Sequence, residues 1–240
     1  MDSILEIRNL SFSFGHRAIF QGVNLRLMPQ DSYALWGPGG VGKSTLLKIV
    51  AGLTPGASGS IRIQGVEVSS ASQRAWQDLR TRLGLVFQEG ALISNLSIYD
   101  NIALPLRYHT RAGEEEVGKR VGDLMGILGI DREVDQTLPA LVPAGLRKLA
   151  AIARALILEP SLLLFDEPTA GLEEASVHRV IQTLKSYQEK RGAALLFTTL
   201  DATLAGSLAN RLGVLGKNRI LIEGAPREIL RSMAKEESGS

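Results

Sequence analysis

The chain has 240 residues, of which 45% are apolar and 22% are charged, and its formal net charge is +2. That length and apolar content are enough for one large domain with a packed core, and they require no second independent domain. The near-balanced charge gives no strong case for nucleic acid binding, and the absence of cysteine excludes a disulfide framework and is compatible with the cytosol.

Two kinds of strand pattern occur along the chain. Alternating apolar and polar residues predict an antiparallel layer with one exposed face, at 4–8, 22–27 and 60–64. Continuous apolar runs predict a mostly parallel sheet that is covered on both faces, at 33–36, 83–87, 161–165 and 194–198. Helical patterns separate these runs, so the fold class we expect is α/β.

The middle of the chain has a different pattern. Between about Glu89 and Glu159 the strand pattern disappears, and apolar residues recur at helical spacing in 117–128 and 146–158. We therefore expect an inserted helical subdomain.

The two ends of the chain carry further expectations. The N-terminal residues have neither a basic region nor a long apolar region, so we do not expect secretion. Pro226 can open a last helix that runs through Met233, followed by a frayed tail from 235 to 240. The apolar runs fall far short of the roughly 20 residues that cross a bilayer, so we expect a soluble protein.

A glycine-rich segment between a predicted strand and a predicted helix has the pattern of a nucleotide phosphate loop. Its backbone N–H groups can converge on phosphate oxygens, and the helix that follows adds its positive dipole end. Within this pattern the lysine would reach the β- and γ-phosphates and the serine would hold Mg²⁺. An accidental glycine-rich turn is the alternative, and the flanking strand and helix argue against it. The candidate nucleotide-binding residues are Gly37, Pro38, Gly39, Gly40, Val41, Gly42, Lys43, Ser44 and Thr45.

A second candidate site follows the apolar run 162–165, which ends in Asp166 and Glu167. Ligands of open α/β sheets gather at the carboxyl ends of strands, so Asp166 can join Ser44 around Mg²⁺. Glu167 could then orient or deprotonate the attacking water. Acidic residues at strand ends also cap helices, but the phosphate loop upstream favours the catalytic interpretation.

Together these motifs resemble the ATP-binding cassette family, the nucleotide-hydrolysing subunits of ABC transporters, from about Ile4 to Arg227. The resemblance implies ATP and Mg²⁺ as cofactors. It also implies that Phe14 stacks on adenine, although an ordinary core or turn phenylalanine is the alternative. Gln88 falls at the family's Q-loop, where a glutamine reaches Mg²⁺ and the attacking water. Ala153-Arg154 matches the helix that follows the signature motif.

The resemblance implies a P-loop NTPase fold with a RecA-like core, an antiparallel β layer and an inserted α-helical subdomain. The whole chain, 1–240, is then one domain. Its parts would be the core with the β layer at 1–88 and 159–225, the helical subdomain at 89–158, and the C-terminal helix and tail at 226–240.

The chain departs from the family at elements that close the site. The signature, usually Leu-Ser-Gly-Gly-Gln, reads Val142-Pro143-Ala144-Gly145-Leu146. Proline offers neither hydroxyl nor N–H to the γ-phosphate bound by the opposite subunit, whereas Gly145 keeps its N–H donor. The family's switch histidine is replaced by Leu200, which cannot bind phosphate. We therefore expect ATP binding to be preserved and turnover to be impaired.

A finer resemblance, to the Mla/MCE lipid-transport branch, is carried by the segments 87–92 and 99–107. It implies a polytopic membrane permease that docks near the Q-loop and helical subdomain, with an envelope lipid-binding protein as a further partner. The ATPase would then lie in the cytoplasm on the inner face of the cell membrane, as a homodimer or as a heterodimer with another ABC ATPase. Apolar residues near the Q-loop could receive a permease helix or belong to the core: Leu92, Ile93, Leu96 and Ile98.

Other functions remain open at this stage. The chain could be a regulatory or degenerate half of an asymmetric ABC dimer with little turnover of its own, or it could serve an importer of another small substrate. A soluble ABC protein of repair or translation is a weaker alternative, because such proteins usually have two cassettes or long coiled-coil insertions and the sequence shows neither. A P-loop small-molecule kinase would leave the order of Gln88, Arg154 and Glu167 unexplained.

Overall fold

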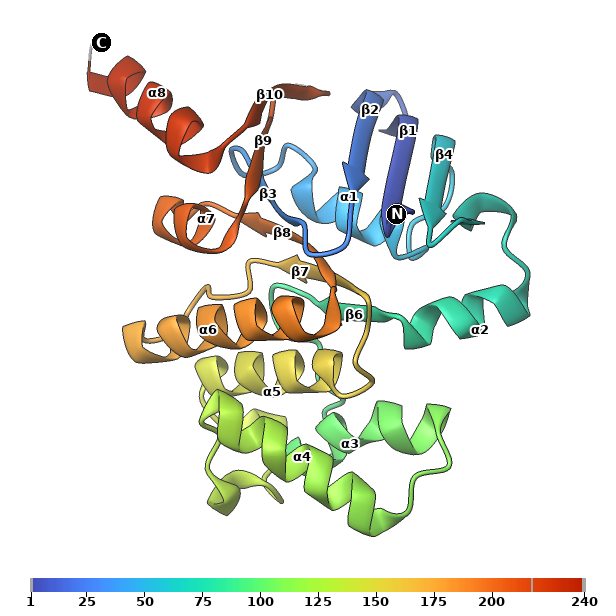
Figure 1. Ribbon diagram of the computed structural model, residues 1–240, viewed down its shortest axis with the longest axis vertical. Helices are drawn as coiled ribbons and strands as arrows, with labels where there is room; N and C mark the ends of the chain where they lie inside the picture. The colour runs from blue at the N-terminus through green and yellow to red at the C-terminus, as the bar shows by residue number, and fades with distance from the viewer. Residues whose placement is uncertain (1, 217, 239–240) are drawn as a thin grey trace.

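A computed structural model describes residues 2–216 and 218–238. It contains two sheets and a set of helices that cover the larger sheet (Figure 1). The larger sheet has the order β10-β9-β3-β8-β7-β6, and the smaller sheet has the order β2-β1-β4-β5. The α/β class with a RecA-like core, an antiparallel layer and a helical subdomain is confirmed.

The larger sheet is parallel except at one edge, where β10 runs antiparallel to β9. Its central strands are buried on both faces, as their continuous apolar runs predict. The sequence patterns did not point to β9 and β10. The strands of this sheet are β3 (Ser32–Trp36), β6 (Leu83–Val86), β7 (Leu162–Asp166), β8 (Ala194–Thr199), β9 (Arg211–Leu215) and β10 (Ile220–Gly224).

The smaller sheet is antiparallel throughout, in agreement with the alternating patterns. Its first two strands are longer than the alternating segments 4–8 and 22–27, because they continue to a hairpin turn at Gly15. This extension places Phe14 at the end of a strand. The strands are β1 (Leu5–Phe14), β2 (Arg17–Leu27), β4 (Ser58–Ile63) and β5 (Val66–Glu67).

The helices between 89 and 159 form the lower part of Figure 1, below β6 and β7. They are α3 (Ile98–His109), α4 (Glu114–Leu128) and α5 (Ala144–Leu156). The remaining helices are α1 (Lys43–Val50), α2 (Gln73–Thr81), α6 (Glu174–Arg191), α7 (Ala202–Leu208) and α8 (Pro226–Ser238). Among the described helices, none is both long and apolar enough to cross a bilayer.

The end of the last helix corrects a sequence-based expectation. The last helix does not stop at Met233 but continues to Ser238, because lysine and glutamate, which favour helix, follow it. The expected tail also includes residues 239 and 240, which lie outside the described residues. The helix α5 begins at Ala144, with Pro143 as its N-cap.

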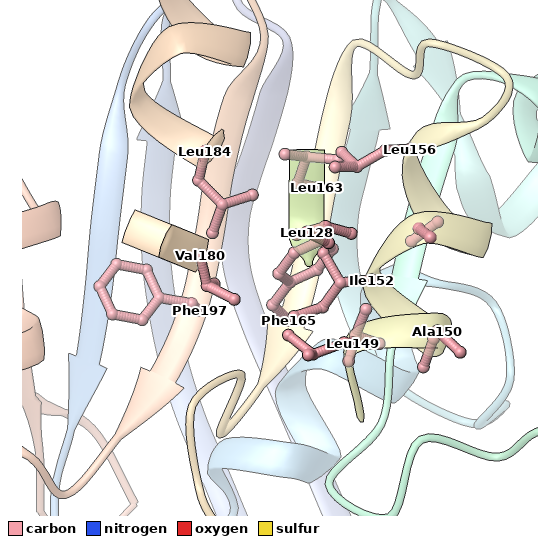
Figure 2. Close-up of a cluster of buried hydrophobic side chains, with 14 of the residues drawn as sticks. Leu128, Leu149, Ala150, Ile152, Leu156, Leu163, Phe165, Val180, Leu184 and Phe197 are labelled. Atoms are coloured by element: carbon pink, nitrogen blue, oxygen red, sulfur yellow. The ribbon is translucent and has the colours of Figure 1, made fainter. Parts of the chain in front are cut away.

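Alternate residues of the central strands face two different buried clusters. On β7, Leu162 and Leu164 face the antiparallel layer, whereas Leu163 and Phe165 face the helices. Figure 2 shows Phe165 next to side chains of α4 and α5, and Phe197 next to a side chain of α6. The cluster on the helix side includes residues from both the expected helical subdomain, 89–158, and the expected core, 159–225. The boundaries of the subdomains therefore remain a proposal.

Candidate functional site

The phosphate loop connects β3 to α1, and crowding explains two of its glycines. A Cβ on Gly42, whose φ is +107°, would lie 2.6 Å from Cγ2 of Ile19. A Cβ on Gly37 would lie 2.4 Å from the Leu215 carbonyl oxygen. Glycine at these two positions therefore lets the loop pack closely against β2 and β9. A nucleotide phosphate fits this cradle.

Lys43 is buried inside the loop, with only 8% of its surface exposed. Its ammonium donates to the carbonyl oxygens of Gly37, at 2.6 Å, and Pro38, at 3.0 Å. Burial lowers the pKa of Lys43, while the nearby Glu167 and Asp166 carboxylates act in the opposite direction. The ammonium is thus held at the loop by neutral carbonyls, which a phosphate oxygen could replace.

Ser44, Gln88 and Asp166 line one cleft of about 750 Å³, although they come from three distant segments. The tertiary structure therefore brings together the three residues that the sequence assigned to Mg²⁺. A hydroxyl, an amide and one carboxylate fit this ion, which binds few protein ligands besides phosphate oxygens and water. The other residues that line the cleft are Lys48, Phe87, Glu89, Ala91, Leu92, Ser94, Pro139, Ala140 and Arg147.

Asp166 and Glu167 are held at the end of β7 by Thr198 of the neighbouring strand β8. The Thr198 hydroxyl donates to Oδ1 of Asp166 at 2.6 Å and accepts the Glu167 N–H at 3.1 Å. Thr198 is fully buried, and its register partner on β7 is Asp166. Sequence analysis missed this residue, although two threonines that end an otherwise apolar strand point to a polar role.

The Glu167 side chain has an environment suited to a general base. Burial raises the pKa of Glu167, while the Leu200 N–H and the Lys43 ammonium act in the opposite direction. Its backbone has a φ of 48°, in the left-handed region that is uncommon for a residue with a side chain.

Phe14 lies away from this cleft, at the tip of the β1–β2 hairpin. Its ring is 56% exposed and packs edge-on against Phe12, with ring centroids 4.8 Å apart. Phe14 is therefore not a core residue, whereas its position beside the hairpin turn agrees with the alternative of a turn phenylalanine. Its register partner Arg17 lines a second cavity together with Gly39, Gly40 and Val41 of the phosphate loop. Stacking of Phe14 on adenine stays a prediction.

Gly145 is not brought to the cleft of its own chain. It lies in the first turn of α5, where a Cβ would be 3.4 Å from the Gly171 carbonyl oxygen and from Leu172. The exposed Pro143 precedes it, and Leu200 is 54% exposed beyond the end of β8. The positions that depart from the family pattern are therefore accessible to a partner subunit or ligand.

Sequence analysis also missed Lys148, a cation on α5 that is only 4% exposed. Its ammonium donates to the backbone carbonyls of Phe87, Gln88 and Glu167. The adjacent basic pair Arg147-Lys148, at the start of a helix with a buried apolar face, was the available signal.

Known proteins with similar sequences are ATP-binding subunits of transporters. A probable ribonucleotide transport ATP-binding protein, mkl, from Mycobacterium leprae is 33% identical over 230 residues, covering 96% of this chain and 66% of the relative. The chain thus spans slightly less than two thirds of that relative. The intermembrane phospholipid transport ATP-binding protein MlaF from Haemophilus influenzae is 30% identical, covering 96% of this chain and 87% of the relative.

Solved structures agree with this fold. The ATP-binding cassette MJ0796, in a dimeric post-hydrolysis state bound to ADP and Pi, matches with a TM-score of 0.85 at 26% identity, covering 93% of this chain and 99% of that chain. The cassette cbiO1 of Clostridium perfringens matches with a TM-score of 0.82 at 27% identity, covering 96% and 92%. The sequence model described as ABC transporter matches residues 20–170, and this chain belongs to the ABC transporter ATP-binding family.

Proposed function

We propose that the chain is the ATP-binding subunit of an ABC transporter, which binds Mg·ATP and hydrolyses it slowly to drive a separate membrane permease. The observation that carries this proposal is the shared cleft of Ser44, Gln88 and Asp166 next to the phosphate loop. Family membership and the ADP- and Pi-bound structure of a related cassette support ATP hydrolysis.

The residues of this chain would divide the work as follows. Loop N–H groups and the α1 N-terminus bind phosphate oxygens, and Lys43 exchanges its carbonyl partners for the β- and γ-phosphates. Ser44, Asp166 and Gln88 would hold Mg²⁺, which neutralises charge on the phosphates when bound. Glu167, with its raised pKa, orients the attacking water and accepts its proton.

Two departures from the family pattern lead us to propose slow turnover. Leu200, at the end of β8, offers no hydrogen bond to a γ-phosphate, and Pro143 offers neither N–H nor hydroxyl to the nucleotide of a partner subunit. Loss of one preorganised contact of this kind costs on the order of a hundredfold in rate. These losses need not add, because neighbouring groups act together.

For cargo and partners, we propose phospholipid or related lipid transport with a polytopic permease. The phospholipid transport relative MlaF supports a lipid-related role, although mkl, which is named for ribonucleotide transport, and importers of sulfate and methionine also match the chain. The subunit would act as a homodimer, or as a heterodimer with another ABC ATPase, in the cytoplasm on the inner face of the membrane. An envelope lipid-binding protein would complete the system.

The permease would dock beside the Q-loop, and the structure narrows the candidate residues. Ile98 is fully buried, so the core interpretation holds for it, whereas Ile93 is 40% exposed. An Ile93→Glu substitution should weaken the complex with the permease and leave ATP binding intact. Unchanged complex formation would contradict docking at this surface.

A second candidate function is an ATP-dependent regulatory half of an asymmetric dimer. The observation that favours it is the loss of both site-closing elements, at Pro143 and Leu200. Retention of Glu167 argues against a fully inactive site.

The deciding experiment measures steady-state ATP turnover by the chain alone and with its co-purified permease, with Glu167→Gln as the control. Turnover that requires the permease and disappears in Glu167→Gln supports a transport motor. Tight ATP binding with no turnover that depends on Glu167 supports the regulatory function. Absence of ATP binding would refute both.

A further inference from the structure

The buried cation Lys148 joins three parts of the site through backbone contacts. Its side chain extends from α5, the helix that begins within the altered signature. The ammonium donates to the Phe87 carbonyl at 3.4 Å, to the Glu167 carbonyl at 3.1 Å, and to the Gln88 carbonyl. An ammonium has three protons, and each of them has a carbonyl acceptor here. All the hydrogen-bond donors of the ammonium are therefore occupied by backbone carbonyls.

A second cation of α5 holds the other end of the same loop. The guanidinium of Arg154 donates to the Gly90 carbonyl at 3.0 Å and to the Ala91 carbonyl at 2.9 Å. Lys148 and Arg154 thus attach the segment 87–91 to α5 at both of its ends. A displacement of α5 would carry this segment, and Gln88 within it, along.

Lys148 differs from Arg154 because it also reaches the sheet. The Glu167 peptide is held on its sheet side by Thr198, which accepts the Glu167 N–H at 3.1 Å. On its helix side the Glu167 carbonyl accepts from Lys148. Lys148 is therefore a direct link between α5 and the backbone of the candidate catalytic carboxylate.

We propose that Lys148 is a positioning residue, which fixes the backbone of Gln88 and Glu167 relative to α5. When α5 closes on a nucleotide, Lys148 moves the Gln88 and Glu167 carbonyls along with the helix. The side chains of Gln88 and Glu167 then reach the attacking water at the same time. This inference rests on the proposed ATP hydrolysis. It assigns the coupling to a residue that touches neither phosphate nor metal.

Two backbone amides offer a readout that does not depend on turnover. The Gly90 N–H donates to the Phe87 carbonyl at 2.9 Å, and the Ala170 N–H donates to the Glu167 carbonyl at 3.2 Å. Both acceptors also bind Lys148. Loss of the ammonium should therefore speed hydrogen exchange at both amides.

The test compares Lys148→Met with Lys148→Arg, which keeps the charge and the donors. An exposed lysine of α4 provides the matched control Lys119→Met, and Arg154→Met tests the loop alone. For the full chain with its permease, we expect Lys148→Met to lower kcat by about 10- to 100-fold, the effect of misplacing catalytic groups by about 1 Å. KM for ATP should stay near the wild-type value, and Lys148→Arg should restore most of kcat.

Hydrogen exchange separates this inference from the function on which it rests. Lys148→Met should speed exchange at both Gly90 and Ala170, and Arg154→Met only at the Q-loop amide. If the wild type has no turnover but this exchange pattern holds, the linkage stands and ATP hydrolysis is wrong. If the wild type is active and Lys148→Met matches it in kcat and in exchange at both amides, the positioning role is overturned. A folded Lys148→Arg protein with the wild-type melting temperature keeps the test valid if Lys148→Met unfolds.

Discussion

The buried hydroxyl of Thr198 should contribute more to stability than its methyl group does. The hydroxyl donates to Oδ1 of Asp166 at 2.6 Å and accepts the Glu167 N–H at 3.1 Å. In Thr198→Val a group of nearly the same shape replaces the hydroxyl, and the carboxylate loses its buried donor. The Glu167 N–H keeps an acceptor, because it also donates to the Thr198 carbonyl at 3.3 Å.

The magnitude follows from these contacts. A hydrogen bond to a charged group contributes about 1.5–3 kcal/mol, so we expect Thr198→Val to lower the free energy of unfolding by about 2 kcal/mol. For a chain of this size that loss lowers Tm by roughly 4–8 °C. Thr198→Ser keeps the hydroxyl and removes one buried methyl group, at a cost of about 1 kcal/mol.

The assay is urea unfolding and thermal melting of the three proteins without nucleotide. We expect the order of stability to be wild type, then Thr198→Ser, then Thr198→Val. If Thr198→Val is as stable as Thr198→Ser or more so, packing rather than the bond to Asp166 dominates at this position, and the reasoning is wrong.

Three further predictions concern Glu167, Gly42 of the phosphate loop, and Leu200. Burial raises the pKa of Glu167 above its usual 4.5, so the wild type should lose stability as the pH rises through that raised pKa. At a pH above the raised pKa, Glu167→Gln should therefore be more stable than the wild type in urea unfolding. The difference in stability between the two proteins should vanish below pH 4.5. Gly42→Ala should cost about 1–3 kcal/mol and abolish ATP binding by calorimetry, because its Cβ would meet Ile19, whereas Gly39→Ala, with open space around its Cβ, should melt like the wild type. Leu200→His should raise steady-state turnover by roughly tenfold or more, since the exposed position can hold a histidine; an unchanged rate would show that Leu200 does not limit hydrolysis.

The local sequence pattern was enough to predict much of the fold, because the periodicity of strands and helices can be detected from residues that are close in the sequence. The apolar run that ends at Asp166 predicted a doubly covered strand, and the structure buries all of its residues. The same reasoning missed the edge strand β10 and its neighbour β9. The residues of β10 are exposed or half-buried, and its apolar run is only the three residues Ile220 to Ile222, so that strand lacks the longer buried run of the central strands.

For the site, spacing alone was enough to propose the phosphate loop and the carboxylate pair. Their chemistry is carried by contiguous residues, Gly37 to Thr45 and Asp166-Glu167, where residue type and order are the constraint. The shared cleft of Ser44, Gln88 and Asp166 required folding, because its members lie at or after the carboxyl ends of three different strands, β3, β6 and β7.

The contacts that hold the site depend on the three-dimensional arrangement for the same reason. Thr198 meets Asp166 because β7 and β8 pair in one particular register, and Lys148 meets the Gln88 and Glu167 carbonyls because α5 packs against two loops. Neither partner lies near the other in the chain. Hydrogen bonds to backbone carbonyls also leave no pattern of residue types, since every residue has a carbonyl. The amino-acid order therefore identifies the groups that would touch nucleotide, while packing selects the buried groups that hold them.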